Sequence, residues 1–269
     1  MYLTLLASSI NGSLHETPPF LVPAGSDGRV ARALTRLGGS RGLVPARYAT
    51  VPPSAFATGE GWPASRLVAA ESMTGAARLA NVRALTERVV CDGVPGDLIE
   101  TGVWRGGSCI LMRGVLAAYG DTIRSVYVAD SFEGLPRTSR TDDDAAYLHE
   151  DDTLAVSVEG VRAAFDRYGL LDSQVRFVEG WFRDTLPTLA GQAWALLRLD
   201  GDLYESTWDA ITNLYEGLSP GGYVIVDDYL TYASCRQAID DYRSQHGITD
   251  DIVEIDRSGV YWRKSDPAA

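Results

Sequence analysis

Four aspartates in the last third of the chain have the residue type and the spacing of a metal-assisted site. Asp200 and Asp202 stand two apart in LDGDLYE (199–205), and Asp227 and Asp228 follow the apolar run GYVIV (222–226). Side chains two residues apart in extended chain point the same way. Three carboxylates from two neighbouring strands would offer the hard oxygen ligands that Mg²⁺ or a similar ion prefers, and a fourth could act as a general base. The alternative is a group of helix caps and turn residues.

Acidic residues also end other apolar runs of the sequence. Glu100 closes DLIET (97–101) and Asp130 closes SVYVAD (125–130). In open α/β sheets, ligands bind outside the carboxyl ends of the strands, so these acids are expected to collect on one rim. Carboxylates crowded there repel one another, which raises their pKa values or requires a cation.

A glycine-rich turn follows the first of these runs. ETGVWRGGS (100–108) carries glycines at 102, 106 and 107, which would let the backbone approach a ligand at a helix start. E-x-G-x-x-x-G differs from the G-x-G-x-x-G of dinucleotide enzymes and suits a nucleoside without a pyrophosphate, such as S-adenosylmethionine. A tight strand-to-helix turn is the alternative.

Two further segments fit the same kind of ligand. Asp130 is placed to accept hydrogen bonds from ribose hydroxyls, or else to cap the next helix. In EGWF (179–182), a glycine precedes Trp181 and Phe182. These rings would either stack on an adenine or belong to the core.

The elements that position these residues follow from apolar periodicity. A helical pattern runs from Pro63 to about Cys91, and short apolar runs rich in β-branched residues follow it. Their spacing favours βαβ units and a parallel sheet, so the fold class is α/β. The runs are DLIET (97–101), SVYVAD (125–130), VRFVEG (175–180), WALLRLD (194–200) and GYVIVDD (222–228), with DIVEID (251–256) and GVYWRK (259–264) as an edge hairpin.

Residues 1–60 differ from the rest of the chain. They are rich in Gly, Pro, Ser and Ala and show no sustained period apart from a possible short helix over Arg29–Leu37. We expect either a loosely packed extension or an arm that acts as a lid or subunit contact, ahead of a main domain at 61–269. The acidic stretch TDDDAAYLHEDD (141–152) is expected to be a solvated loop or, less simply, a loop that covers a ligand.

The bulk composition excludes several classes of protein. The 269 residues suffice for one large α/β domain. A net charge of −12 argues against nucleic acid and membrane surfaces as partners, and no apolar run approaches the roughly 20 residues of a membrane span. The start of the chain lacks the features of a signal peptide, and its three cysteines are too scattered for a disulfide framework. We therefore expect a cytoplasmic protein with reduced thiols.

At these residues the chain resembles the metal- and S-adenosylmethionine-dependent sugar O-methyltransferases of antibiotic biosynthesis, the macrocin, mycinamicin and novobiocin tailoring type. The resemblance runs from about Trp62 to the end. It implies a Rossmann-like class I methyltransferase fold with a seven-stranded sheet, methylation of a sugar hydroxyl on a glycosylated secondary metabolite, and a homodimer or higher oligomer. Its most specific stretches are GVPGDLIETGVWRGGSCILMRGVLAAYGDT (93–122), VADSFEGLP (128–136), GWFRDTLP (180–187), LRLDGDLYEST (197–207) and LSPGGYVIVDDY (218–229).

The resemblance also implies roles for individual residues. Asp200, Asp227 and Asp228 would ligate Mg²⁺ or a similar cation, and Asp202 would be the general base. Met73 lies in WPASRLVAAESMTGAARLAN (62–81), the counterpart of a family segment that covers the cofactor. The pocket for S-adenosyl-L-methionine would be lined by Met73, Glu100, Gly102, Ser108, Asp130, Ser131, Phe132, Ser157, Gly180, Trp181, Phe182 and Asp200.

Other functions stay open from the sequence alone. The acceptor could carry a non-sugar hydroxyl of the catechol type. D-x-D also occurs in metal-dependent glycosyltransferases, which do not explain ETGVWRGG, and in phosphatases, which carry it after their first strand. A methyltransferase fold without activity is disfavoured because all four acids are present.

Overall fold

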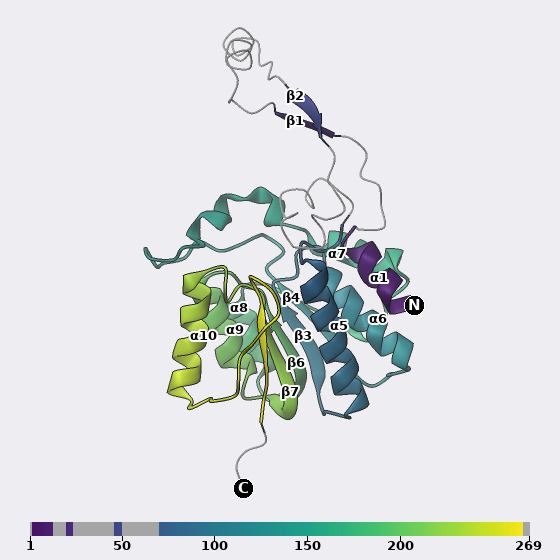
Figure 1. Ribbon diagram of the computed structural model, residues 1–269, viewed down its shortest axis with the longest axis vertical. Helices are drawn as coiled ribbons and strands as arrows, with labels where there is room; N and C mark the ends of the chain where they lie inside the picture. Colours follow the sequence, from purple (N-terminus) through teal and green to yellow (C-terminus); the bar gives the residue numbers. More distant parts are fainter. Residues whose placement is uncertain (1, 13–19, 24–45, 50–69, 266–269) are drawn as a thin grey trace.

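The computed structural model describes residues 2–12, 20–23, 46–49 and 70–265, and within them the chain forms a layered α/β fold (Figure 1). The helices are α1 (Tyr2–Ile10), α5 (Ala76–Cys91), α6 (Gly107–Tyr119), α7 (Val158–Arg167), α8 (Phe182–Thr185), α9 (Tyr204–Leu214) and α10 (Ala233–Gln245), with short 3₁₀ helices η2 (Ala146–Glu150), η3 (Asp152–Leu154) and η4 (Leu186–Leu189). The strands are β1 (Phe20–Pro23), β2 (Ala46–Ala49), β3 (Asp97–Thr101), β4 (Val126–Asp130), β5 (Val175–Glu179), β6 (Trp194–Leu199), β7 (Leu218–Val226), β8 (Val253–Glu254) and β9 (Val260–Arg263).

Seven strands form one sheet in the order β5-β4-β3-β6-β7-β9-β8, while β1 and β2 pair only with each other. The first five strands of that order pair in parallel, and β9 pairs antiparallel with both β7 and β8. The predicted α/β class, the parallel sheet and the antiparallel C-terminal hairpin are confirmed. Because the strand order reverses between β3 and β6, the crevice for a ligand is expected at the ends of these two strands.

Successive side chains of the central strands point to opposite faces of the sheet, so the core lies in two layers. Leu98 and Leu196 pack with α5 and α6 on one face of the sheet, and their neighbours Ile99 and Leu197 pack with α9 and α10 on the other (Figure 1). All four side chains are fully buried. Burial of a large aliphatic side chain contributes about 1.5–3 kcal/mol, so these strands form a stable base for whatever stands at their ends.

The helix predicted from Pro63 starts later than its periodicity indicates. α5 begins at Ala76 and ends at Cys91 as predicted, residues 70–75 are not helical, and 63–69 lie outside the described residues. The prediction is wrong for 70–75 because this segment makes tertiary hydrogen bonds instead, such as the bond from the Gly107 amide to the Glu71 carbonyl at 3.0 Å.

Part of the predicted N-terminal arm packs on the main domain. The buried side chain of Leu6 in α1 lies against Gly114 of α6, and the Ile10 carbonyl accepts a hydrogen bond from the Glu71 amide at 2.8 Å. The domain boundary at 60 and the possible helix over 29–37 lie outside the described residues. The role of the arm as a lid or subunit contact therefore stays a prediction.

The acidic stretch at 141–152 is tied to two helices. Asp143 is buried, and its carboxylate accepts hydrogen bonds from the Tyr204 amide and the Ser234 hydroxyl, both at 2.9 Å. The prediction of a solvated loop is wrong for Asp143, because its carboxylate satisfies a free backbone donor at the start of α9 and binds a side-chain hydroxyl in the first turn of α10. Asp142 is exposed, as predicted.

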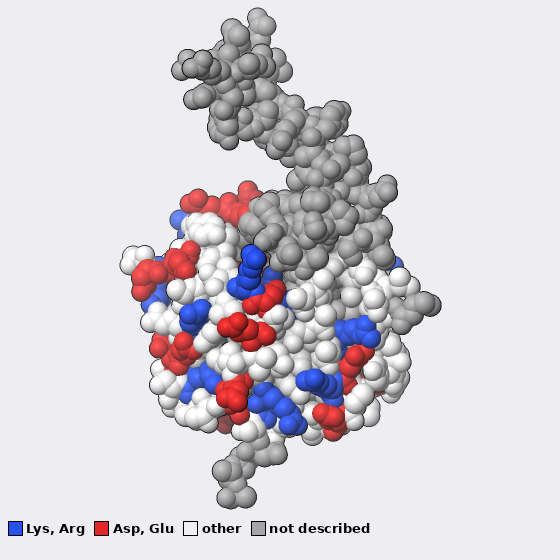
Figure 2. Space-filling view, in the orientation of Figure 1, with Lys and Arg blue, Asp and Glu red and all other residues white. Residues whose placement is uncertain are grey.

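The described surface carries both signs of charge. Figure 2 shows acidic and basic side chains interspersed on the described part of the visible face, with no broad basic area on it. Among the described residues, none of the helices combines the length and the hydropathy that a bilayer crossing requires.

Candidate active site

The predicted acids stand at the carboxyl ends of the central strands. Asp130 ends β4, Asp200 follows β6 and Asp227 follows β7. Backbone hydrogen bonds join these ends, because the Asp200 amide donates to the Thr101 carbonyl at 2.9 Å and the Asp227 amide donates to the Leu199 carbonyl at 3.0 Å. The backbone of these acids is therefore hydrogen-bonded to the neighbouring strand, which holds the acids in defined positions.

The loops that leave this rim have an unusual backbone. Among the described residues, three other than glycine have a left-handed φ, namely Trp104 (48°), Phe132 (59°) and Asp202 (54°), and each follows a central strand. Such conformations cost on the order of 1–3 kcal/mol and gather at functional sites. Gly102 (φ 87°) is required for another reason, because a Cβ there would overlap the backbone carbonyl of Asp200.

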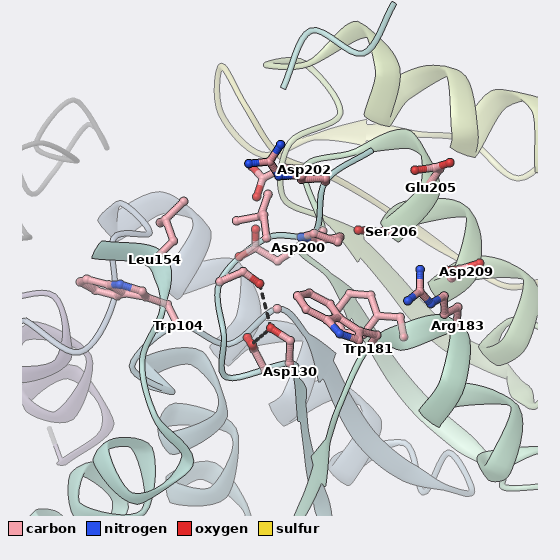
Figure 3. A pocket seen from close by; sticks show the side chains of 18 of the residues that line it. Trp104, Asp130, Leu154, Trp181, Arg183, Asp200, Asp202, Glu205, Ser206 and Asp209 are labelled. Atoms are coloured by element: carbon pink, nitrogen blue, oxygen red, sulfur yellow. Dashed lines mark hydrogen bonds between the residues drawn. The ribbon is translucent and has the colours of Figure 1, made fainter. Parts of the chain in front are cut away.

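A cavity of about 390 Å³ opens beside the glycine turn (Figure 3). In Figure 3, the Trp181 ring and the carboxylates of Asp130 and Asp200 border one space. Aromatic surface beside carboxylates suits a nucleoside, whose base stacks and whose hydroxyls donate hydrogen bonds. Predicted cofactor residues that line the cavity are Met73, Gly102, Asp130, Ser131, Trp181, Phe182 and Asp200.

Asp130 is held in place by backbone donors. Its carboxylate accepts hydrogen bonds from the Val103 amide at 2.7 Å and the Phe132 amide at 2.8 Å. Burial raises the pKa of Asp130, and these hydrogen bonds oppose the rise because they stabilise the charged form. Since the next helical element starts only at Ala146, the alternative role of Asp130 as a helix cap is wrong.

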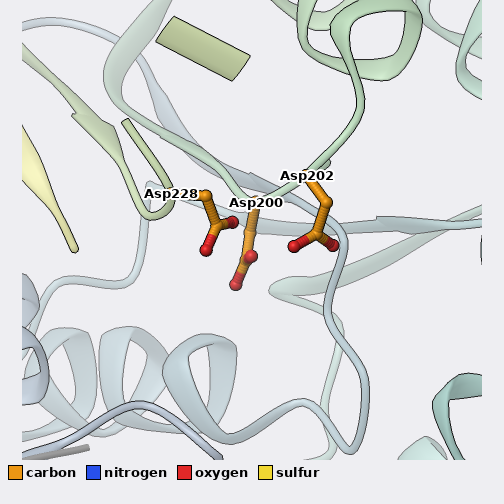
Figure 4. A group of neighbouring side chains, drawn as sticks. All are labelled: Asp200, Asp202 and Asp228. Atoms are coloured by element: carbon orange, nitrogen blue, oxygen red, sulfur yellow. The ribbon is translucent and has the colours of Figure 1, made fainter. Parts of the chain in front are cut away.

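Three carboxylates converge beyond the end of β6 (Figure 4). One oxygen each from Asp200, Asp202 and Asp228 lies within 4.8 Å of the others. Oδ2 of Asp228 is buried and has no hydrogen-bond partner. An unpaired buried carboxylate oxygen is unfavourable, and a hard cation among these oxygens would satisfy it. The residues present therefore fit a divalent cation.

The structure does not bring Asp227 into this trio. Its two carboxylate oxygens accept hydrogen bonds from Arg78 and Arg198, and Arg78 also contacts Asp256 at 3.1 Å. The predicted ligand set of Asp200, Asp227 and Asp228 thus shares two members with the group that converges.

Burial and crowding shift the pKa values of these carboxyls upward. Burial raises the pKa of Asp202 to about 8, and the neighbouring charges of Asp200 and Asp227 add to the rise. Burial also raises the pKa of Asp228 well above the ordinary value, with the carboxylates of Asp202 and Asp200 contributing. Without a cation, this crowding of carboxyls therefore favours bound protons, and positive charge of another kind could take their place.

A second cavity, of about 400 Å³, shares the acids with the first. Both cavities are lined by Met73, Trp104, Leu154, Asp200 and Asp202. A group transfer needs two compartments of this kind, because each reactant can occupy one while the reacting atoms meet between them. The second cavity adds Arg78, Tyr147, Asp227, Asp228, Thr231, Tyr232, Asp256, Arg257 and Ser258.

Five predicted cofactor residues lie elsewhere. Ser157 is exposed and caps α7 through its hydroxyl, Phe132 packs in the core, and Gly180 follows β5 without lining either cavity. Glu100 and Ser108 line the second cavity rather than the first. Their contact with a cofactor stays a prediction.

Sequence reasoning missed the cations and one aromatic group of the site. Arg198 is buried in β6, Arg78 pairs with Asp227, and Tyr232 lines the second cavity. A signal for Arg198 was available, because a charge inside the apolar run WALLRLD requires a buried partner. The sequence around Arg78 and Tyr232 carries no such signal, so only the fold reveals their positions.

Three features together define a class I methyltransferase fold: the strand order that reverses between β3 and β6, the cavity whose lining suits a nucleoside, and the antiparallel C-terminal hairpin. The family model for macrocin O-methyltransferase (TylF) matches residues 25–264. The chain belongs to this family and is an S-adenosylmethionine-dependent O-methyltransferase. The glycosyltransferase and phosphatase alternatives are thereby excluded.

Individual relatives agree with this assignment. The chain is 56% identical over 215 residues to 8-demethyl-8-(2,3-dimethoxy-alpha-L-rhamnosyl)-tetracenomycin-C 4'-O-methyltransferase of Streptomyces olivaceus, covering 78% of this chain and 80% of the relative. It is 52% identical over 211 residues to demethyldecarbamoylnovobiocin O-methyltransferase of Streptomyces niveus, covering 77% and 79%. The solved structure of the O-methyltransferase NovP superposes with a TM-score of 0.81 at 44% identity, covering 98% of both chains.

Proposed function

We propose that this enzyme methylates a sugar hydroxyl of a glycosylated small molecule with the help of Mg²⁺ or a similar ion. The observation that carries the proposal is the junction of the two cavities at Asp200 and Asp202. The first cavity takes the methyl donor and the second takes the acceptor. The name of the Streptomyces olivaceus relative, a 4'-O-methyltransferase of a rhamnosyl tetracenomycin, supports a sugar as the acceptor.

The lining of the second cavity favours a sugar over a catechol. Thr231, Tyr232 and Ser258 bring hydroxyl groups to it, and Arg78 and Arg257 bring guanidiniums. Sugar hydroxyls are recognised through such donors and acceptors, whereas a flat aromatic ring is held mainly by apolar and aromatic surface.

In this proposal Asp200, Asp227 and Asp228 ligate the cation. The partnerless Oδ2 of Asp228 and its closeness to Asp200 support two of these ligands. Asp227 keeps capacity for a cation beside its arginines, because each carboxylate oxygen has two lone pairs. When bound, the cation would lower the pKa of the sugar hydroxyl.

The residues of the chain do the rest. Asp202 takes the proton of the acceptor hydroxyl while the oxygen of that hydroxyl attacks the methyl carbon. The sulfonium leaves as a neutral thioether. Asp130 holds the nucleoside through its ribose, so the methyl group points at the junction of the two cavities. In-line placement of this kind can contribute on the order of 7–11 kcal/mol.

Mass spectrometry of reactions with glycosylated natural products and with aryl diols tests the proposal. We expect a gain of one methyl group on glycosides, loss of turnover in EDTA, and recovery with Mg²⁺. Asp228→Asn should abolish Mg²⁺ binding in calorimetry, whereas Asp251→Asn, which alters an exposed acid, should not. Transfer that persists without metal would refute the cation, and transfer to aryl diols alone would refute the sugar.

A further inference from the structure

The reaction described above leaves one charged group at the centre of the site unused. Arg198 is only 1% exposed and belongs to β6, a strand whose six residues are all buried. A guanidinium does not give up its proton in a protein, so a buried arginine destabilises the fold unless partners compensate it in place. Its partners therefore indicate what the residue is for.

Four side chains from separate parts of the chain meet Arg198. Nη1 donates to Glu100 of β3 and, at 2.6 Å, to Asp200 after β6. Nη2 donates to Asp227 after β7 and, at 3.1 Å, to the hydroxyl of Thr74 ahead of α5. Hydrogen bonds between charged groups are about twice as strong as neutral ones, so this arginine orients three carboxylates at once.

The register of the sheet produces this arrangement. Glu100 and Arg198 are direct cross-strand partners, and Arg198 in turn lies opposite Ile225 of β7. Both charged side chains lie two residues after leucines that face α5 and α6, so they point to that same face. One guanidinium can therefore span the ends of β3, β6 and β7.

Glu100 extends the network to α6 and to the start of the glycine turn. Its second carboxylate oxygen accepts a hydrogen bond from the thiol of Cys109 in α6 at 2.8 Å. Glu100 also stands two residues before Gly102, which lines the donor cavity. Arg198 thus links the strand that leads into the glycine turn with the acids after β6 and β7, and one of these acids, Asp200, lines both cavities.

We propose that Arg198 is a positioning residue that fixes Glu100 at the end of β3, ahead of the glycine turn, and fixes Asp200 and Asp227 at the ends of β6 and β7, so that both ligand sites are assembled in advance. The inference rests on the proposed function, since it treats the two aspartates as cation ligands. Arg198 acts through these acids.

A simpler role for Arg198 predicts the opposite result. If the residue only added positive charge, its removal would relieve repulsion and tighten Mg²⁺ binding. If it holds the acids, its removal frees them to rotate, and Mg²⁺ binding weakens in spite of the lost repulsion. The direction of the change separates the two roles.

Calorimetric titration of Mg²⁺ and of S-adenosylhomocysteine into wild type, Arg198→Met and Arg198→Lys tests the proposal. Arg113→Met is the matched control, because Arg113 is also buried and contacts Asp172 with two nitrogens, at 3.1 and 2.5 Å. We expect Arg198→Met to weaken Mg²⁺ binding about tenfold or more, as loss of a residue that orients metal ligands does. Binding of S-adenosylhomocysteine should weaken about fivefold.

The controls make each outcome decisive. Arg198→Lys keeps the positive charge but lacks the several N–H donors of a guanidinium, so it should show a smaller loss of affinity for Mg²⁺ and for S-adenosylhomocysteine. Arg113→Met should show no loss of either affinity. Thermal melting verifies folding, and the lysine variant carries the test if the methionine variant does not fold. Unchanged or tighter Mg²⁺ binding in folded variants, or an unchanged donor affinity, overturns the proposal. If wild type itself binds the donor analogue but no Mg²⁺, the proposed cation is wrong and this inference falls with it.

Discussion

Replacing Asp202 by asparagine removes the proposed base with little change in shape. Asparagine tolerates the left-handed backbone of this position (φ 54°) as aspartate does, so the loop should keep its conformation. A positioned general base contributes about 10²–10⁴-fold in rate, which corresponds to about 3–5 kcal/mol. We expect kcat to fall by that factor, while the affinity for the methyl donor stays unchanged because Asp130 and Trp181 are untouched.

The same substitution should stabilise the protein when no cation is bound. Burial raises the pKa of Asp202 to about 8, whereas an aspartate in the unfolded chain titrates near 4. At pH 7 the folded state therefore keeps a proton that the unfolded state releases, which destabilises the fold by up to about 4 kcal/mol. Asp202 is partly exposed, and part of its raised pKa comes from the neighbouring charges of Asp200 and Asp227, so the expected gain is roughly 1–2 kcal/mol.

Three measurements check this prediction. Mass spectrometry of the methylated product gives kcat, calorimetry with S-adenosylhomocysteine gives the donor affinity, and melting in EDTA gives the stability. Asp166→Asn, which alters an exposed acid of α7, should change none of them. Wild-type turnover in a folded Asp202→Asn variant would show that another group takes the proton. A lower melting temperature in EDTA would show that the crowding argument is wrong.

Two further predictions concern the acid cluster and the glycine turn. Without a cation, the melting temperature should fall as the pH rises from about 5 to 8. The reason is that an acid whose pKa is raised in the folded state, such as Asp202, destabilises the fold above its unfolded pKa and increasingly so up to its folded pKa. Saturating Mg²⁺ should flatten this slope, and a melting temperature that rises over this pH range would contradict the argument. Gly102→Ala should lower stability by about 2 kcal/mol or more and weaken donor binding, because its Cβ would overlap the Asp200 carbonyl. Gly120→Ala is the matched control in melting and calorimetry, since Gly120 also has a left-handed φ (68°) but open space around it, and an equal loss in both variants would show that strain alone is responsible.

The central strands could be predicted closely from the sequence. The run at 97–101 is β3 at the same bounds, and the run at 194–200 is β6 to within one residue. Continuous apolar residues that end in an acid or a glycine leave little choice of bounds when both faces are buried. The start of α5 could not be predicted in this way, because residues 70–75 use their backbone for contacts with α1 and α6 that no local pattern records.

The site could be predicted in outline only. The rule that ligands bind at the carboxyl ends of strands was sufficient to bring Asp200, Asp202 and Asp228 together. The pairing of Asp227 with Arg78 could not be predicted, since it joins residues 149 apart in the chain through the rotamers of two long side chains. For Ser157, the local sequence determines that its hydroxyl caps α7. Its position away from both cavities depends on the tertiary fold, so it could not be predicted.

The charges of the cluster connect its protons with its cation. Around Arg198 and Arg78 stand six carboxyls, those of Glu100, Asp200, Asp202, Asp227, Asp228 and Asp256, so the acids outnumber these two guanidiniums. The raised pKa values of Asp202 and Asp228 mean that, without metal, protons offset part of this excess. A divalent cation would offset a similar charge and displace those protons, which leaves Asp202 ionised as a base requires. The two arginines compensate part of the charge of Glu100, Asp200 and Asp227, which lowers the free-energy cost of holding so many carboxyls close together around one cation site.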